Sequence, residues 1–186
     1  MPTIVRSLRA IGVTTVCITD FDILNDENPL REIFIELGGQ WQNLERDWKL
    51  VKTSVDGKRP ELGVSEVRDQ IQAVLNLPPE SKISKSVVTE IQKILKRSSP
   101  WSHAKQVGKQ FVPSGEPTQA RDRLFRNCKE LGLFIVEVGE LESFVKSVGN
   151  HGPAWVNDVV AKALATDPEL VDARNFISQI EQYTPS

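Results

Sequence analysis

Two short runs of consecutive apolar and β-branched residues interrupt a chain whose apolar residues otherwise recur mostly with helical spacing. The first run covers residues 13–19 (VTTVCIT), and the second covers residues 133–138 (LFIVEV). Runs of this kind are typical of strands that are buried on both faces of a parallel sheet. A glycine that ends a helical pattern, Gly12 or Gly132, precedes each run. We therefore predict a helix followed by a buried strand at both places.

Amphipathic helices account for much of the remaining sequence. Residues 27–37 carry Leu30, Ile33, Phe34 and Leu37 at the i, i+3, i+4, i+7 positions of one helix face. Trp41, Leu44, Trp48 and Val51 give residues 41–55 the same character. Further helices are predicted over residues 1–12, 116–131 and 155–165, and from residue 167 onward.

The middle of the chain has a different pattern. Between residues 58 and 100, charged residues alternate with two modest apolar stripes, and no strand pattern is present. We interpret residues 58–112 as an all-helical insertion between two parts of an α/β core, residues 1–57 and 113–186. The predicted fold class is α/β and helix-rich, with a small parallel sheet flanked by helices.

Composition limits the classes of protein that fit. A chain of 186 residues with 39% hydrophobic residues is expected to form one globular domain, with or without an insertion. A formal net charge of −2 argues against bulk electrostatic attraction to nucleic acid, although it leaves room for a local basic patch. Cys17 and Cys128 lack neighbouring zinc ligands, so we expect both to be reduced core residues. No signal peptide pattern and no run of about 18 apolar residues occurs, which predicts a cytoplasmic protein without membrane contact.

An acidic pair follows each predicted strand. Asp20 and Asp22 come directly after the first strand, and Glu140 and Glu142 come after the second. Side chains at i and i+2 of an extended chain project the same way, so like charges there repel unless a cation lies between them. Carboxylate oxygens suit Mg²⁺ or Mn²⁺, and ligands of open α/β sheets bind beyond the carboxyl ends of the strands. The alternative is that these acids form a solvated turn and a helix cap.

Three other residues are weaker candidates. Lys105 and Lys109 are four residues apart, so they share a face if that segment is helical, and they could contact phosphate. The alternative is a solvated surface. His151 lies in a distinctive loop, GNHGPAW at residues 149–155, from which no mechanism follows.

Several segments together resemble a known family. The segment VCITDFDIL at residues 16–24, followed by an amphipathic helix and Gly38-Gly39, resembles the Asp-x-Asp segment of Toprim domains. The likeness is to the C-terminal Toprim region of OLD-family ATP-dependent endonucleases. Residues 99–108 (SPWSHAKQVG), 131–144 (LGLFIVEVGELESF) and 149–156 (GNHGPAWV) also fit that region.

The resemblance implies a Toprim-like, Rossmann-like sheet and divalent-metal-dependent cleavage of DNA. It implies that Asp20 and Asp22 bind Mg²⁺ or Mn²⁺ and take part in catalysis, together with Glu140 or Glu142. In such sites the metal stabilises charge on the scissile phosphate and activates water.

Two parts of the family pattern are missing from this sequence. Toprim domains begin with a strand that ends in a catalytic glutamate, in a pattern like Glu-Gly-x-x-Asp, and the family also carries an ATPase domain. We therefore expect a truncated piece whose activity is impaired, or depends on an ATPase domain or subunit supplied by another chain. The missing strand would leave a neighbouring strand edge unpaired, which predicts self-association.

Two other interpretations compete with the nuclease. One is a non-catalytic interaction or regulatory module built on a degenerate Toprim scaffold. The other is a phosphatase similar to haloacid dehalogenases, a class that also places Asp-x-Asp after an early strand. Here Ile23 and Leu24 follow in place of the expected Gly-Thr, and a later Asp pair is missing.

Overall fold

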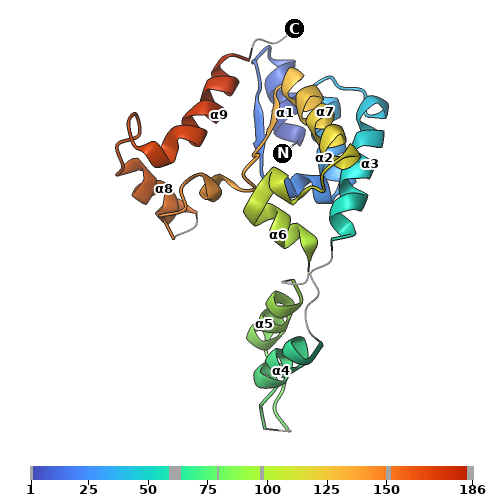
Figure 1. The fold of residues 1–186 in the computed structure, drawn as a ribbon, viewed down its shortest axis with the longest axis vertical. Coiled ribbons are helices and arrows are strands. Elements are labelled where there is room, and N and C mark those ends of the chain that lie inside the picture. Colours follow the sequence, from blue (N-terminus) through green and yellow to red (C-terminus); the bar gives the residue numbers. More distant parts are fainter. Residues whose placement is uncertain (1, 59–63, 79, 97–98, 150–151, 184–186) are drawn as a thin grey trace.

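The computed structural model describes residues 2–58, 64–78, 80–96, 99–149 and 152–183. Most of these residues form a body of helices around a short sheet, and two helices lie apart from that body (Figure 1). The α-helices and strands, in chain order, are α1 (Pro2–Ala10), β1 (Cys17–Thr19), α2 (Glu27–Glu36), α3 (Gln42–Asp56), α4 (Val64–Val74), α5 (Lys85–Lys96), α6 (Pro100–Val107), α7 (Glu116–Glu130), β2 (Leu133–Ile135), α8 (Pro153–Val160) and α9 (Val171–Glu181). Short 3₁₀ helices cover Phe21–Asn25, Gly108–Phe111, Leu141–Phe144 and Pro168–Leu170.

Both predicted strands are present but shorter than expected. β1 and β2 pair in parallel, with Cys17 opposite Leu133 and Thr19 opposite Ile135, and they form a two-stranded sheet in the described part of the chain. Residues 13–16 are not part of the strand; at the start of this segment the Val13 N–H still bonds to the end of α1, donating to the Leu8 carbonyl at 3.0 Å. Beyond β2, only the Val136 N–H extends the ladder, donating to the Thr19 carbonyl at 2.8 Å.

Helices cover both faces of this sheet. Successive side chains of a strand point to opposite faces. Leu133 and Ile135 belong to the main core cluster, which α2, α3, α6 and α7 supply with most of its side chains. Phe134 and Val136 pack instead against Phe176 of α9. The fold is therefore α/β in its layering and dominated by helices, as the sequence predicts.

The main core lies on one side of the sheet. The apolar stripes predicted for α2 and α3 are buried there, which confirms both helices. The largest packing contact in the body joins α3 to α7, where the Arg123 guanidinium donates two hydrogen bonds to the Asp47 carboxylate at 2.6 and 3.0 Å. Cys17 and Cys128 are buried and unbridged, as expected, and burial raises the pKa of both thiols.

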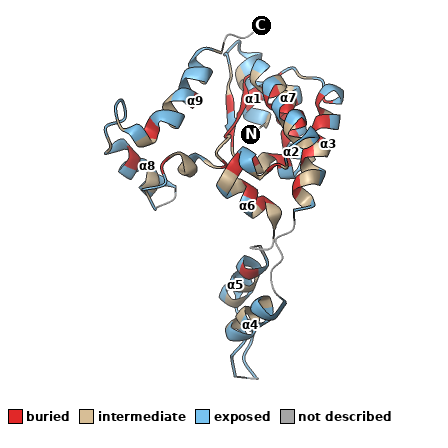
Figure 2. Cartoon of the chain, viewed as in Figure 1, coloured by how far each residue is buried: buried red, intermediate tan, exposed pale blue. Residues whose placement is uncertain are grey.

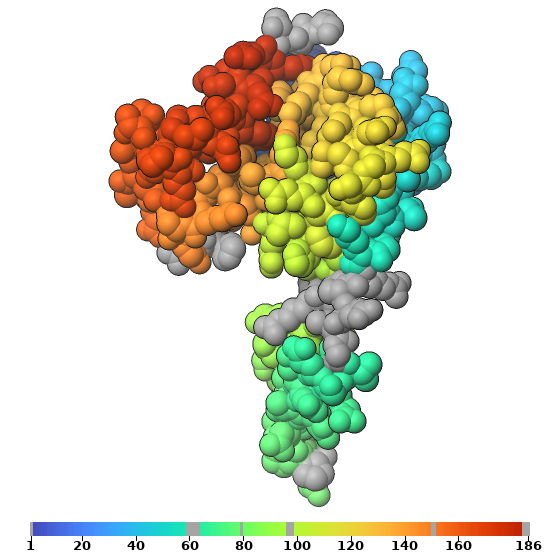
Figure 3. Space-filling view, in the orientation of Figure 1, coloured from blue at the N-terminus to red at the C-terminus, as the bar shows by residue number. Residues whose placement is uncertain are grey.

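The helices α4 and α5 differ from the body in burial (Figure 2). They pack mainly on each other, and Ile94 is their only buried large apolar side chain within residues 64–78 and 80–96. Figure 3 shows this pair of helices projecting from the rest of the molecule. We call residues 64–96 the hairpin. The chain returns to the body at α6, whose Trp101 and Ala104 belong to the main core.

Across the described residues, none of the helices combines the length and apolar character that crossing a membrane would require.

Candidate functional site

The parallel sheet brings the ends of its two strands to one edge. Asp20 follows β1 directly, and the turn after β2 leads to Glu140. A short main-chain hydrogen bond, from the Phe21 N–H to the Gly139 carbonyl at 2.6 Å, holds the two exits together. The acidic residues after the two strands are therefore neighbours because the strands are parallel and in register.

Asp20 has an extended backbone, but Asp22 does not, so the sequence-based expectation of an extended chain through both aspartates is wrong. Asp20 precedes the 3₁₀ helix Phe21–Asn25, so the backbone turns between the two carboxylates. The reason is the core: Phe21 and Leu24 are completely buried, and the turn lets both of them point inward. The acidic side chains remain on the outer side of this turn and are partly exposed.

The centre of the site is the ammonium group of Lys105, on α6. Its Nζ atom lies 3.2 Å from Asp20 Oδ2, 3.5 Å from Asp22 Oδ2 and 3.9 Å from Glu140 Oε2. Burial alone would lower the pKa of Lys105, but the hydrogen bond to Asp20 and the negative charges of all three carboxylates together raise it. Lys105 is therefore a cation to which both strand exits contribute carboxylates.

Two glycines allow α6 to come this close to the strand exits. Gly108 has φ +63° and Gly139 has φ +116°, values that favour glycine. A Cβ atom at Gly139 would lie 2.1 Å from the Lys105 carbonyl oxygen, and one at Gly108 would lie 2.1 Å from the Glu137 carbonyl oxygen. The Lys109 N–H also donates to that Glu137 carbonyl at 2.8 Å. Direct backbone contact thus determines where Lys105 lies.

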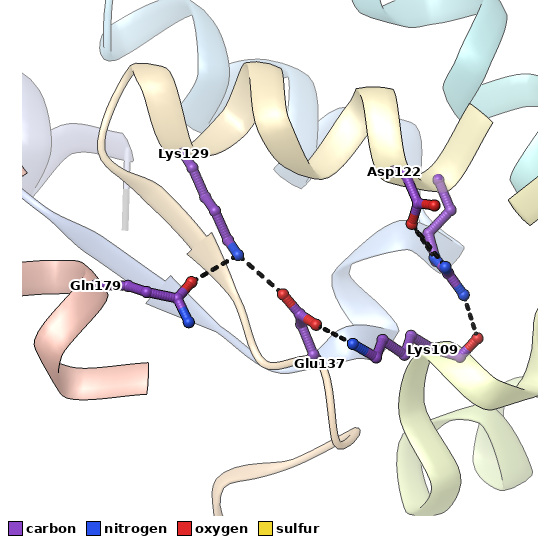
Figure 4. A network of polar contacts seen from close by, with 6 residues as sticks. Lys109, Asp122, Lys129, Glu137 and Gln179 are labelled. Carbon is purple, nitrogen blue, oxygen red and sulfur yellow. Dashed lines mark hydrogen bonds and ion pairs between the residues drawn. The ribbon is translucent and has the colours of Figure 1, made fainter. Parts of the chain in front are cut away.

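Lys109 is separated from Lys105, although the spacing predicted a shared helix face. The cause is Gly108, where α6 ends and the backbone turns away. The Lys109 ammonium lies 2.5 Å from Glu137 Oε2, and Lys129 donates to Glu137 Oε1 and Gln179 Oε1 at 2.8 Å each (Figure 4). Burial alone would raise the pKa of Glu137, but the hydrogen bonds from the two lysines lower it. This network ties the segment after β2 to α7 and α9.

Glu140 is the second-strand acid that reaches the site. Glu142 instead accepts a hydrogen bond from the Gly152 N–H at 3.3 Å, within the loop that leads into α8. The structure therefore separates two residues that the sequence leaves as alternatives. His151, a weak candidate for phosphate contact, lies outside the described residues.

An open groove of about 410 Å³ runs along one side of the acidic pair, lined by Ile18, Thr19, Asp20, Asp22, Ile23, Asp26 and Pro29. Thr19 is only 8% exposed, and its hydroxyl oxygen has no hydrogen-bond partner among the described residues. A buried polar atom without a partner is costly, so this hydroxyl marks a local weakness at the end of β1.

Oxygen donors that already surround one cation fit a hard divalent metal ion such as Mg²⁺ or Mn²⁺. The residues that would hold it are Asp20, Asp22 and Glu140. In the described part of the chain, however, no three acidic, histidine or cysteine side chains approach closely enough to hold a metal in their present positions. The carboxylates would have to draw together as the Lys105 ammonium moves out.

Sequence reasoning missed the central role of Lys105. A lysine more than eighty residues away from an acidic pair has no local pattern that connects it with those acids. Two glycines mark the contact, one just after Lys105 on the chain and one just before Glu140. These two glycines were the only sign in the sequence that the two segments approach each other closely.

Comparisons of this chain with models of protein families, with curated proteins and with solved structures found no match.

Proposed function

We propose that this chain is a Toprim-type, divalent-metal-dependent DNA endonuclease domain whose activity alone is impaired or depends on a partner. The observation that carries the proposal is the convergence of Asp20, Asp22 and Glu140 on one cation at the carboxyl edge of a parallel sheet. Oxygen ligands at that edge are the usual setting for metal-assisted phosphate chemistry in α/β folds.

The residues of the chain have distinct parts in this proposal. Asp20, Asp22 and Glu140 bind Mg²⁺ or Mn²⁺, which would stabilise charge on the scissile phosphate and activate water. Lys105 neutralises the carboxylates in the absence of the ion and offers a positive charge to a phosphate in its presence. The groove beside β1 leaves Asp20 and Asp22 accessible from solvent.

Metal titration by calorimetry tests the site directly. We expect weak Mn²⁺ binding, and we expect Asp20→Asn to reduce the affinity at least about tenfold, within the range that loss of a metal-supporting group produces. Asp69→Asn is the matched control, because Asp69 is an exposed aspartate of the hairpin. Equal Mn²⁺ affinity in wild type and Asp20→Asn would refute the proposal.

A plasmid-nicking assay with Mn²⁺ tests the activity. We expect the chain alone to nick DNA poorly, and any nicking to disappear in Asp20→Asn. Robust nicking by the isolated chain, lost in Asp20→Asn, would support the nuclease and contradict impairment. Nicking that persists in the variant would point to a contaminant and count against the proposal.

The non-catalytic alternative is favoured by Lys105 itself, because an ammonium that fills an acidic cluster is also a purely structural ion pair. In that case Mn²⁺ binds neither wild type nor Lys105→Met. The phosphatase alternative uses Asp20 as a nucleophile on a phosphoryl group held by Lys105. Hydrolysis of an aryl phosphate, lost in Asp20→Asn, would favour it over the nuclease.

A further inference from the structure

The hairpin carries a second apolar stripe besides the one that joins its two helices. The joining stripe contains Val67 and Val74 of α4 and Val87 and Ile94 of α5, which are all at least partly buried. The second stripe is exposed: Val64 is 84% exposed, Leu75 41%, Val88 43% and Leu95 50%. A pair of helices needs only one apolar stripe to pack together, so the second is available for another contact.

Helical geometry places the exposed residues of both helices on one side of the hairpin. At about 100° per residue, Val64 and Leu75 are rotated from the joining stripe of α4 by about 60–100°. Val88 and Leu95 are rotated from the joining stripe of α5 by about 80–120° in the same sense. In two consecutive helices that pack antiparallel, rotations of the same sense lead to the same side of the pair. The hairpin therefore presents one continuous apolar face, which we call the docking face.

The docking face is hollowed along α4. An open groove of about 590 Å³ is lined by Val64, Val67, Arg68, Ile71, Gln72 and Leu75. These positions recur at the spacing of one helix face, so the groove follows the helix axis. An elongated apolar groove beside a helix has the shape that accepts a second amphipathic helix.

The charges nearest the docking face are two cations, one of which has an acidic neighbour. Arg68 lines the groove, and Lys85 lies at the outer border of the face on α5. The acids of the two helices are Glu66, Asp69 and Glu90, and their helix positions point away from this face. The Asp69 carboxylate nevertheless lies 3.8 Å from Arg68 Nε, an exposed pair that is worth little and that a partner carboxylate can replace. A second copy of the hairpin would bring its own basic borders against these cations, which disfavours self-association through this face.

We propose that the docking face binds an amphipathic helix of a partner protein whose apolar residues are flanked by aspartate and glutamate. Leu75, Leu95, Val64 and Val88 would contact the apolar residues of that helix, and Arg68 and Lys85 would pair with its acids. The proposal does not rest on the nuclease function, because none of its residues belongs to the acidic site.

The test uses two designed fluorescent peptides of about 18 residues, long enough to form a helix. Both have leucines along one face; one has glutamates at the flanking positions and the other has lysines. Fluorescence anisotropy with the full chain should show at least about tenfold tighter binding of the glutamate peptide. Arg68→Glu should reduce that preference, and added salt should weaken it.

Variants separate the docking face from the rest of the hairpin. The double variant Leu75→Ser, Leu95→Ser should lower the affinity for the glutamate peptide at least about tenfold, because apolar contacts that the complex would bury are lost. Ala73→Ser, at an exposed position on the other side of α4, is the control and should leave binding unchanged. Circular dichroism establishes that each variant keeps its helices.

Several outcomes would overturn the proposal. Equal binding of the two peptides, or unchanged binding in the double variant, would do so. Tighter binding to phosphatidylcholine–phosphatidylserine vesicles than to the glutamate peptide would assign the face to a membrane surface instead. A dimer seen by sedimentation, and lost in the double variant, would assign it to a second copy.

Discussion

The body and the hairpin are both helical, but they are held together in different ways. The body surrounds its sheet with buried apolar side chains on both faces. In the described part of the hairpin, Ile94 alone is a buried large apolar residue. Because burial of apolar area is the main favourable contribution to folding, the stability of this protein belongs to the body. Amphipathic sequences form helices in both regions. The helices of the body pack against a sheet and several other helices, whereas the two helices of the hairpin pack mainly against each other.

The largest expected difference comes from one substitution made in each region. Leu124→Ala, in the completely buried centre of α7, should lower the free energy of unfolding by about 2–5 kcal/mol. Leu95→Ala, at a half-exposed position of α5, should change it by less than about 0.5 kcal/mol. Urea denaturation measures both. Similar losses would show that the hairpin shares the core of the body, and the comparison would fail.

The next effect concerns the backbone contact that positions the site within the body. Gly139→Ala places a Cβ atom against the Lys105 carbonyl, whereas Gly115→Ala, also at positive φ, meets nothing within 4 Å. Both substitutions cost about 1–2 kcal/mol from the unfavourable φ. Gly139→Ala should cost about 2 kcal/mol more, because backbone must separate from backbone. Urea denaturation compares the two, and equal losses would mean that the contact is not tight.

A smaller effect compares one lysine in each region. Lys105→Met removes the cation that three carboxylates share, while Lys93→Met in the hairpin removes a lysine paired with Glu90 at 3.2 Å. Because these pairs are partly exposed, we expect Lys105→Met to cost about 0.5–1 kcal/mol and Lys93→Met less. Millimolar Mn²⁺ should restore the melting temperature of Lys105→Met and should leave that of Lys93→Met unchanged. Indifference of both variants to Mn²⁺ would contradict the metal interpretation.

The smallest effect is a dependence on pH in the C-terminal part of the body. Hydrogen bonds from the Ser147 hydroxyl and main-chain N–H, and from Lys162, lower the pKa of Glu169 from 4.5 to about 2. A lowered folded-state pKa stabilises the protein above the unfolded value, and this contribution is lost as pH falls from about 4.5 towards 2. Melting temperatures across that window should fall more steeply in wild type than in Glu169→Gln. Ser147→Ala should give an intermediate slope, and identical slopes would contradict the assignment.

The helices of the body were predictable because their apolar residues recur at helical spacing, and these are the residues that the core buries. Leu30 and Trp48 mark faces that the sequence predicts to be buried, and both faces are buried in the structure. The strands were predictable in place but not in length. An apolar run shows that a segment is buried, whereas the number of paired residues depends on a partner strand that lies elsewhere in the chain.

The site could be predicted only in part. The acidic residues were visible because each follows a strand signal, and a parallel sheet brings such residues to one edge. For Lys105 the sequence offers only its charge and its spacing to Lys109, which leave phosphate contact and a solvated surface as alternatives. Its actual position depends on Gly108 and Gly139, which allow two distant segments to touch. Contacts between segments far apart in the chain produce no repeating pattern of residues, so periodicity in the sequence does not reveal them.

The pairing of β1 with β2 also has a consequence for the order of folding. The paired residues are more than one hundred positions apart in the chain, so the loop that their pairing closes is long. Contacts of such separation form late, after local helices. During synthesis, Asp20 and Asp22 leave the ribosome long before Lys105 and Glu140 exist. The acidic site is therefore expected to be among the last parts of the molecule to form, and any cation bound there would select chains whose folding is complete.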